Sequence, residues 1–293
     1  MVNAAPSTAS PRIRCRQIED ADLASVVDLL KKGFGARRSR RFWRKVIDRL
    51  ISRVPPDGLP KYGYLLQSDG RAVGVILQIF ATIRTGPVPT VRCSVSSWYV
   101  DPKFRSYAGL LSAQALKHKG VTYLNVSPAP NTWPLLEAQG YQRLNRGAFL
   151  AIPVLSSRSE PARIMQAGDP EIAAGAVERE LLLQHADYGC HAFWCVNGGQ
   201  AFPFVFRTRV VKRVIPCLQL VYCRDVADVA RFAAPIGRYL ALRGFPLVVI
   251  DADGPIAGLP GKYFDGVMTK FVRGPDRPRL GDLAYSELAV LGI

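Results

Sequence analysis

The stretch "WYVDPKFRSYAGLL", residues Trp98 to Leu111, stands where an apolar run stops and a helical pattern begins. The residues that lead into it, Thr90–Val100, have the β-branched and aromatic character of a strand. A proline, an arginine and several small residues then precede the leucines. A helix start offers unpaired backbone N–H groups, and small residues let that backbone approach a bound anion. The stretch therefore predicts a strand-to-helix turn that can hold phosphate groups.

Strands and helices on both sides of this turn form a mixed α/β pattern. In the first half we predict helices over 19–35, 37–53, 107–119 and within 128–141, and strands over 12–18, 61–83 (two strands), 90–100, 121–127 and 148–155. In the second half we predict helices over 171–188 and 226–243, and strands around the 196–200 turn and over 214–223, 246–252 and 263–273. The order of elements recurs without a residue-level repeat, which indicates two diverged copies of one fold.

Two segments without apolar periodicity set the expected boundaries. Residues 1–11 contain no apolar stretch and are predicted to be a disordered tail. The segment "SSRSEPAR", residues Ser156–Arg163, is polar and is predicted to be a linker. We therefore expect one domain over 12–155 and a second over 164–293.

Composition limits the class of protein and its partners. With 39 Lys and Arg against 23 Asp and Glu, the formal net charge is +16, which attracts nucleotides, nucleic acid, acidic lipid or phosphorylated cofactors. The six cysteines form no CxxC pair, which favours a reduced, cytoplasmic protein. A membrane-spanning helix needs an apolar run of about 20 residues. No run in this sequence approaches that length, so we expect no span.

A basic helix is predicted over residues 37–53. An apolar stripe at helical spacing is formed by Phe42, Val46, Ile47, Leu50 and Ile51, while arginines and lysines crowd the remaining surface with Asp48 as the single acid. Two interpretations stay open: a solvated helix face, or a site for an anionic partner or membrane surface.

The segment "HADYGCHAFWC" contains two histidines and two cysteines, the residue types that bind zinc. Their spacing matches no standard zinc site, and the adjacent Cys190 and His191 would point to opposite faces of a strand. We therefore expect no metal.

Residues 12–155 resemble the GNAT superfamily, the GCN5-related, acyl-CoA-dependent N-acyltransferases. Its main marker is a strand ending in apolar-x-Val-x-Pro, then Gln/Arg-x-x-Gly-x-Gly/Ala at a helix start. Val100, Pro102 and Arg105 match this marker, whereas Ala108 and Leu110 stand at its small-residue positions. A second marker, an Asn followed by a short helix that closes on Gly and an aromatic residue, matches "NTWPLLEAQGY" from Asn131.

The resemblance implies an acyl-CoA N-acyltransferase fold, with a central twisted mixed sheet flanked by helices, in two tandem copies. It also implies acetyl-CoA or another acyl-CoA as co-substrate and a small-molecule or peptide amine as acceptor. Backbone N–H groups near Trp98–Val100 would polarise the thioester carbonyl. The residues expected to bind the co-substrate are Trp98, Tyr99, Val100, Arg105, Ser106, Tyr107, Ala108, Gly109, Leu110 and Asn131.

The proton-transfer residues are less well marked. The family's usual acid is a Tyr at the position of Leu136, so Tyr141 or Tyr123 is the candidate substitute, with a packed aromatic as the alternative for each. Glu137 is the candidate base, with an exposed helix face as the alternative, and Asp101 is expected to cap the following helix. Ser94 or Ser96, which share a strand face with Trp98, could relay a proton through water.

The second half carries "YCRDVADVARF" after its corresponding strand, with no glycine near the helix start. We therefore expect a degenerate copy that binds no ligand, packs against the first and shapes the acceptor cleft. The alternative function is a non-catalytic binding or scaffold protein that has kept the fold, engaging an anionic partner through Arg37–Arg53.

Overall fold

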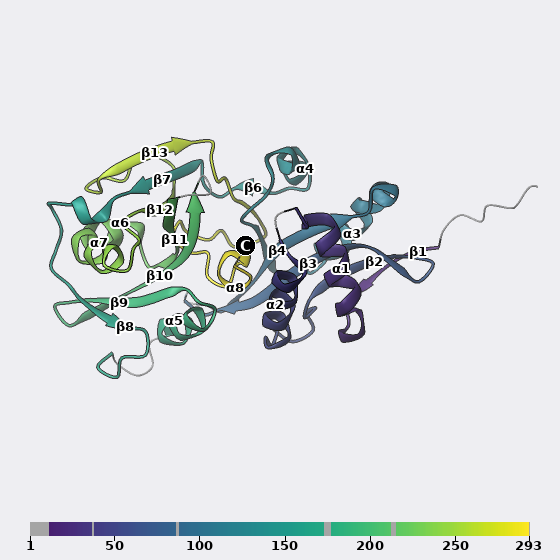
Figure 1. Ribbon diagram of the computed structural model, residues 1–293, viewed down its shortest axis with the longest axis horizontal. Coiled ribbons are helices and arrows are strands. Elements are labelled where there is room, and N and C mark those ends of the chain that lie inside the picture. The colour runs from purple at the N-terminus through teal and green to yellow at the C-terminus, as the bar shows by residue number, and fades with distance from the viewer. Residues whose placement is uncertain (1–11, 37, 86–87, 173–176, 212–214, 293) are drawn as a thin grey trace, which may run out of the picture. The chain divides into compact units, whose positions relative to one another are not determined.

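The computed structural model describes residues 12–36, 38–85, 88–172, 177–211 and 215–292 (Figure 1). The chain forms two compact units, Met1–Ile79 with Val95–Lys119, and Phe80–Ser94 with Gly120–Ile293. The strands β3 (Arg71–Ile83) and β4 (Thr90–Val100) contribute residues to both units. Across the described ranges, every helix is too short or too polar to span a bilayer.

The first unit contains an antiparallel sheet region and three α-helices. β1 (Ile13–Gln17) pairs with β2 (Gly63–Ser68), which pairs in turn with β3. The β2–β3 turn is built on Asp69 and Gly70, both with positive φ, as in a tight hairpin. The helices are α1 (Leu23–Phe34), α2 (Arg40–Ile51) and α3 (Ala108–Ala115).

In the second unit, the start of β4 pairs in parallel with β5 (Val121–Asn125). β14 (Phe271–Arg273) lies antiparallel to β5 and to β6 (Gln142–Arg143), although it is remote from both in sequence. The short helix α4 (Trp133–Ala138) lies between β5 and β6 along the chain.

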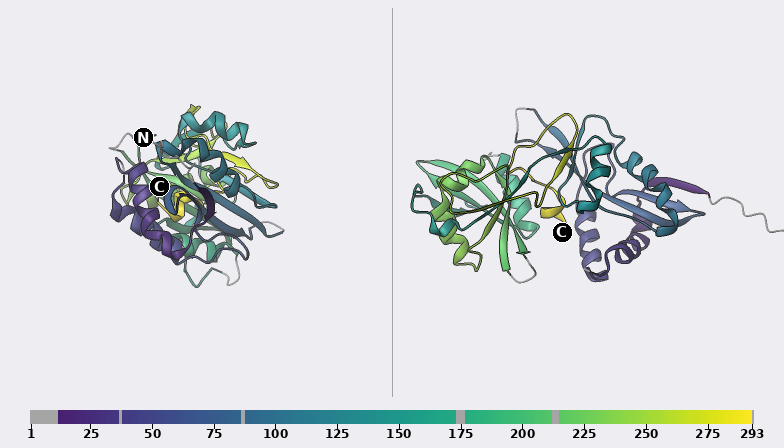
Figure 2. Two further views of the ribbon diagram at one scale, coloured as in Figure 1. Left: turned by 90° about the vertical axis from the view of Figure 1, so that its right-hand side faces the viewer. Right: turned by 90° about the horizontal axis from the view of Figure 1, so that it is seen from above.

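The second sheet lies wholly in the second unit. Its strand order is β13 (Gly261–Asp265), β7 (Gly147–Ala151), β12 (Val248–Ala252), β11 (Ile215–Cys223), β10 (Gln200–Val211), β9 (His191–Asn197) and β8 (Arg163–Gln166). Helices α6 (Val226–Arg231) and α7 (Ala233–Ala241) cover one face (Figure 2). Helix α5 (Val177–Asp187) covers the other, because alternate residues of β9 join different clusters of buried side chains.

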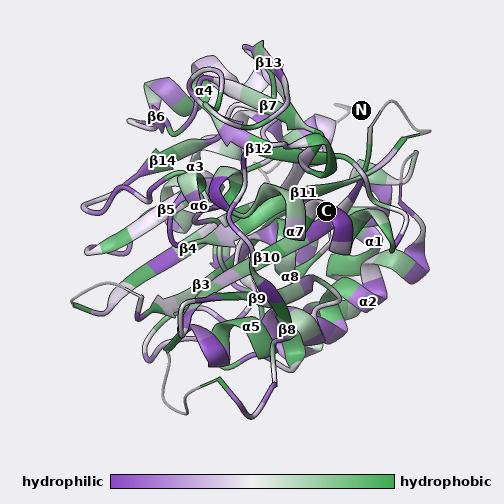
Figure 3. Ribbon diagram, turned by 90° about the vertical axis from the view of Figure 1, so that its left-hand side faces the viewer, coloured by the Kyte–Doolittle hydropathy of each residue, from purple (hydrophilic) through white to green (hydrophobic). Residues whose placement is uncertain are grey.

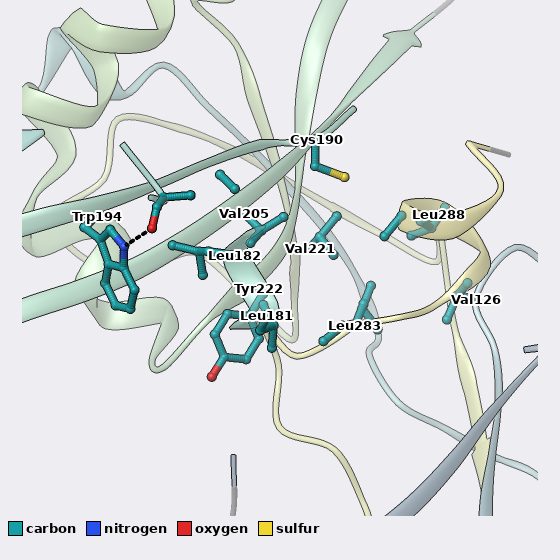
Figure 4. Close-up of a cluster of buried hydrophobic side chains, with 14 of the residues drawn as sticks. Val126, Leu181, Leu182, Cys190, Trp194, Val205, Val221, Tyr222, Leu283 and Leu288 are labelled. Atoms are coloured by element: carbon teal, nitrogen blue, oxygen red, sulfur yellow. Dashed lines mark hydrogen bonds between the residues drawn. The ribbon is translucent and has the colours of Figure 1, made fainter. Parts of the chain in front are cut away.

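The cluster of buried side chains beneath α5 also includes residues of the C-terminal segment, which we define as residues 281–291 (Figure 4). Leu181 of α5, Trp194 of β9 and Leu288 of α8 (Glu287–Val290) are all buried in it. The indole of Trp194 donates a hydrogen bond to the carbonyl of Ala167 at 3.2 Å. Its one polar atom is therefore satisfied, as is usual for a buried tryptophan. The C-terminal residues are thus part of the core of the second unit.

The predicted types of the main elements are confirmed, but several partners and boundaries differ. β7, expected to close the first half, pairs instead with β12 and β13 of the second sheet. The predicted strand 263–273 is two strands in different sheets, β13 and β14. Helix 226–243 breaks at Phe232, which places Pro235 in the first turn of α7, where a missing N–H costs little. The division expected at Ser156–Arg163 thus coincides with neither the sheets nor the compact units.

Candidate functional site

Strand β4 contains one residue with a left-handed backbone, Ser97, whose φ is 50°. This left-handed conformation costs a non-glycine residue about 1–3 kcal/mol and occurs preferentially at functional sites. The Ser97 hydroxyl lies 3.0 Å from that of Ser96. The parallel register with β5 runs from Val91 to Ser94, before this residue. The left-handed residue thus stands directly before Trp98–Val100, the residues expected to face a thioester.

The residues after β4 form a continuous helical segment. Pro102–Tyr107 is a 3₁₀ helix that passes directly into α3, and the N–H of Phe104 donates to the carbonyl of Asp101 at 2.8 Å. Ala108 has a φ of −59°. This position therefore needs no left-handed residue. Arg105 and Gly109 are exposed, and a Cβ added at Gly109 would meet no heavy atom within 4 Å. The segment therefore presents a cation and an uncovered backbone position.

The other residues predicted to bind the co-substrate, within this segment and at the end of β4, differ in exposure. Ser106 and Leu110 are exposed, and Tyr107 is half-buried, as is Trp98. Val100 is buried. The indole N–H of Trp98 is buried and, within the described residues, has no hydrogen-bond partner. A buried donor without an acceptor is costly, which marks Trp98 as a position where a bound group could accept a hydrogen bond.

Tyr99 lies against α1. Its hydroxyl donates to the Asp101 carboxylate at 2.9 Å, and Lys32 pairs with the same carboxylate at 2.7 Å. Burial, and then the hydrogen bond to Asp101, raise the pKa of Tyr99. Asp101 makes no side-chain capping bond, so its predicted capping role is wrong: the carboxylate is committed to Tyr99 and Lys32. These contacts fix the end of β4 to α1.

We expect the substitution Gly33→Ala to destabilise the protein by about 1–2 kcal/mol, because overpacking outweighs the gain in helix propensity. A Cβ at Gly33 would lie 2.4 Å from the Tyr99 ring, which its hydrogen bond to Asp101 holds in place. Denaturant unfolding at pH 7 measures the change. The control is Ser25→Ala, on an exposed position of α1. It should change stability by no more than about 0.5 kcal/mol, as is usual for a surface substitution. A gain in stability for Gly33→Ala would contradict this account.

Three candidate residues belong to the second unit. Asn131 is exposed in a short 3₁₀ helix before α4. Glu137 is also exposed, and two nitrogens of Arg143 bind its carboxylate at 3.0 and 3.1 Å. Tyr141 is buried, and burial raises the pKa of its phenol. The roles of Asn131, Glu137 and Tyr141 stay predictions.

The basic helix α2 forms within the predicted range with a buried and an exposed face (Figure 3), but Ile51, predicted on the apolar stripe, is exposed, and Trp43 is buried in addition. Trp43, Val46, Ile47 and Leu50 are buried. The exposed residues include Arg41, Arg44 and Lys45, while Arg40 pairs with Asp28 at 2.9 Å. Arg37 lies outside the described residues. An anionic partner for this face stays a prediction.

The histidines and cysteines of the second half have separate surroundings. His185 is buried in α5, where one ring nitrogen lies 2.7 Å from the carbonyl of Leu181 and the other accepts from the N–H of Tyr285 at 3.1 Å. His191 begins β9, and burial lowers its pKa. In the part of the chain that the structure describes, three or more potential metal ligands do not gather at any point.

The C-terminal segment makes contacts with β11 that the sequence does not predict. Its residues Gly281–Leu283 pair with the end of β11: Leu283 donates to Val221 at 2.8 Å, and Cys223 donates to Gly281 at 2.9 Å. β11 pairs in parallel with β12 only at Leu218 and Gln219 within the described register. Beyond those two residues, β11 forms its backbone hydrogen bonds along this edge with Gly281–Leu283 instead. The sequence around Asp282 and Glu287 contains no motif that signals these contacts.

Comparisons with known proteins identify the fold. No family profile matches the sequence, and no curated protein does. A GCN5-related N-acetyltransferase from Anabaena variabilis is similar in structure, with a TM-score of 0.58, 10% identity and coverage of 95% of this chain and 75% of that one. One from Kribbella flavida has a TM-score of 0.54, 14% identity and coverage of 92% and 72%. A candidate acetyltransferase from Pyrococcus horikoshii has a TM-score of 0.55, 10% identity and coverage of 98% of each chain.

Proposed function

We propose that this chain, which has the acyl-CoA N-acyltransferase fold in two tandem copies, transfers an acyl group from acyl-CoA to the amine of a small molecule or peptide. The observation that carries the proposal is the left-handed backbone of Ser97 within β4, together with the exposed Arg105 and Gly109 in the helical segment that follows the strand. A strained strand residue near a cationic, uncovered helix start suits a ligand with a carbonyl at one point and phosphates at another.

The residues of the first unit fit such a ligand. Arg105 can form charge-assisted hydrogen bonds with a pyrophosphate, and the open space beside Gly109 lets phosphate oxygens approach. The unpartnered indole N–H of Trp98 can donate to a carbonyl of the ligand. Bound acyl-CoA would supply the thioester. The N–H groups of Trp98–Val100 are assigned to stabilise the charge that develops on its oxygen.

Two features of the second copy favour a co-substrate site in the first copy. There the end of β11 is hydrogen-bonded by Gly281–Leu283, so its backbone is already occupied by the chain itself. Asp225 caps α6 by accepting from the N–H of Ala227 at 2.9 Å, which places a carboxylate at the helix start. A negative charge at that position repels phosphates. The prediction of a second copy that binds no ligand is consistent with both features.

Isothermal titration of the whole protein with acetyl-CoA and with CoA tests the proposal. Arg105→Ala should weaken binding by about 10- to 100-fold, the value of a hydrogen bond to a charged group. Gly109→Trp should also weaken it, because the indole fills space that is open in the wild type. Lys103→Ala, which removes an equally exposed cation from the same 3₁₀ helix, is the matched control and should have a smaller effect.

Two results would decide against the proposal. Absence of binding of either ligand at millimolar concentration would overturn it. Binding without transfer to any amine would favour the alternative, a protein that has kept the fold as a non-catalytic binding module. Release of the CoA thiol in the presence of amines distinguishes the two functions.

A further inference from the structure

The outward face of α2 carries three cations that have no acidic partner. Arg41, Arg44 and Lys45 are exposed, and among the residues that the structure describes none of them is in an ion pair. Residues three or four apart lie on one face of a helix, so these side chains stand together (Figure 3). Asp48, the single acid of α2, is exposed on the same face and offsets only one of the three charges. The face therefore keeps a surplus of positive charge.

Exposed aliphatic side chains stand at the C-terminal end of this face. Ile51, one residue of which lies seven positions after Arg44, is 45% exposed, and Val54, which follows the helix end, is 90% exposed. Helix α2 places its core contacts on the opposite face, where Val46 and Leu50 are buried. Ile51 and Val54 are therefore available for contact with an apolar phase outside the protein.

The helix that presents these residues is firmly held. Trp43 of α2 is fully buried, and its ring centroid lies 5.6 Å from that of Phe34 at the end of α1. At the other end of the helix, the hydroxyl of Ser39 accepts a hydrogen bond from the N–H of Phe42 at 3.2 Å. Binding at this face orders side chains on a backbone that is already fixed, which lowers its entropic cost.

We propose that this face, formed by Arg41, Arg44, Lys45, Ile51 and Val54, docks on the acidic headgroups of a lipid bilayer. The negative surface potential of such a bilayer attracts lysine and arginine side chains. The aliphatic side chains can enter the boundary between headgroups and acyl chains, where they leave water. The inference goes beyond the proposed acyl transfer and does not depend on it.

A bilayer fits this face better than a nucleic acid does. Nucleic acids without sequence preference are bound by cations combined with exposed aromatic side chains on which bases stack. The aromatic residues of α2 are not placed for stacking: Trp43 is buried, and Phe42 is half-buried with the Arg38 guanidinium 5.3 Å from its ring centroid. Exposed aliphatic groups gain nothing from a phosphate backbone, whereas a bilayer removes them from water.

The test is co-sedimentation of the whole protein with two kinds of vesicle, phosphatidylcholine alone and phosphatidylcholine with about one-third phosphatidylglycerol. We expect binding to the acidic vesicles only, and weaker binding as salt shortens the screening length. The combined substitution Arg41→Gln, Arg44→Gln and Lys45→Gln should weaken binding by about 100-fold, since each cation near an acidic surface contributes about fivefold. The combined substitution Ile51→Ser and Val54→Ser should weaken binding by about tenfold, because less apolar surface leaves water.

A matched control separates the α2 face from the net charge of the protein. Arg71→Gln, Lys119→Gln and Arg158→Gln together remove the same number of charges from exposed positions outside α2. This control should weaken binding by less than about threefold, because cations at a distance from the bilayer are screened. All substituted positions are exposed, so melting temperatures should stay close to that of the wild type.

Four results would overturn the inference. They are a wild type that does not bind acidic vesicles, equal binding to both kinds of vesicle, an equal loss of binding in the control, and unchanged vesicle binding after the Ile51 and Val54 substitutions. In the last case the face would bind a short DNA duplex as well as it binds vesicles, which a parallel titration measures. Acetyl-CoA affinity should be the same in the wild type and all variants, so failure of the proposed function is recognised separately.

Discussion

Replacing Arg92 with methionine should destabilise the protein by about 3–5 kcal/mol, the cost of leaving a buried charge without its partner. Arg92 binds Asp282 through two nitrogens at 3.1 Å each, and both side chains are at most 7% exposed. Arg92 also donates to the backbone carbonyl of Asp282 at 3.3 Å. The ion pair fastens the C-terminal segment to β4. Thermal or denaturant unfolding measures the stability change.

The pH dependence of this variant gives a second check. In the wild type the Arg92 guanidinium holds the pKa of the Asp282 carboxyl below its ordinary value. The ion pair therefore contributes its full stabilisation at a pH above that ordinary pKa. This stabilisation is lost as the pH falls through the lowered pKa. Without Arg92, burial disfavours the charged carboxylate, and protonation at low pH relieves the cost. The stability difference between wild type and Arg92→Met should therefore narrow as pH falls. A difference that is constant with pH would contradict this account.

An exposed ion pair provides the control for Arg92. Arg40 pairs with Asp28 at 2.9 Å, with about half of each side chain exposed. Because exposed ion pairs contribute little, Arg40→Met should change stability by no more than about 1 kcal/mol. Equal effects at Arg92 and Arg40 would show that burial of the Arg92 pair is not what determines its contribution.

Lys270→Met should have a similarly large effect, about 3–5 kcal/mol, because it leaves the buried Asp251 of β12 without its ion-pair partner. The Lys270 ammonium binds the Asp251 carboxylate and donates to the carbonyl of Met268 at 3.2 Å. Its backbone N–H donates to Asn145 at 2.8 Å. Burial raises the pKa of Asp251 and lowers that of Lys270, so each charged form depends on the other.

A double-mutant cycle isolates this interaction. The combined substitution Lys270→Met with Asp251→Leu removes both charges and should recover most of the lost stability, since apolar replacement of a buried pair is often neutral. Unfolding of the four proteins at pH 7 measures the coupling. A double variant as unstable as the sum of the two single variants would show that the ion pair is not the cause.

The predictive value of the sequence was greatest for local structure. The turn at Asp69–Gly70, the apolar face of α2 and the strand Thr90–Val100 were all predicted, because strand and helix periods are written in neighbouring residues. The candidate phosphate-binding residues could also be selected, since Arg105 and Gly109 lie close together in the chain. Their exposure, and the left-handed backbone at Ser97, came from the structure.

Sequence by itself thus determined the order of elements in this protein and the stretch from Trp98 to Leu111 that ends a strand and begins a helix. The tertiary structure alone decided which sheet β7 and β14 join, because the alternation of a strand fixes its buried face but not its neighbour. It also decided that Asp282 meets Arg92, 190 residues away, and that Glu287 meets Ser94 and Ser127. Such contacts depend on long-range packing that buries the C-terminal segment, for which local propensity contains no information.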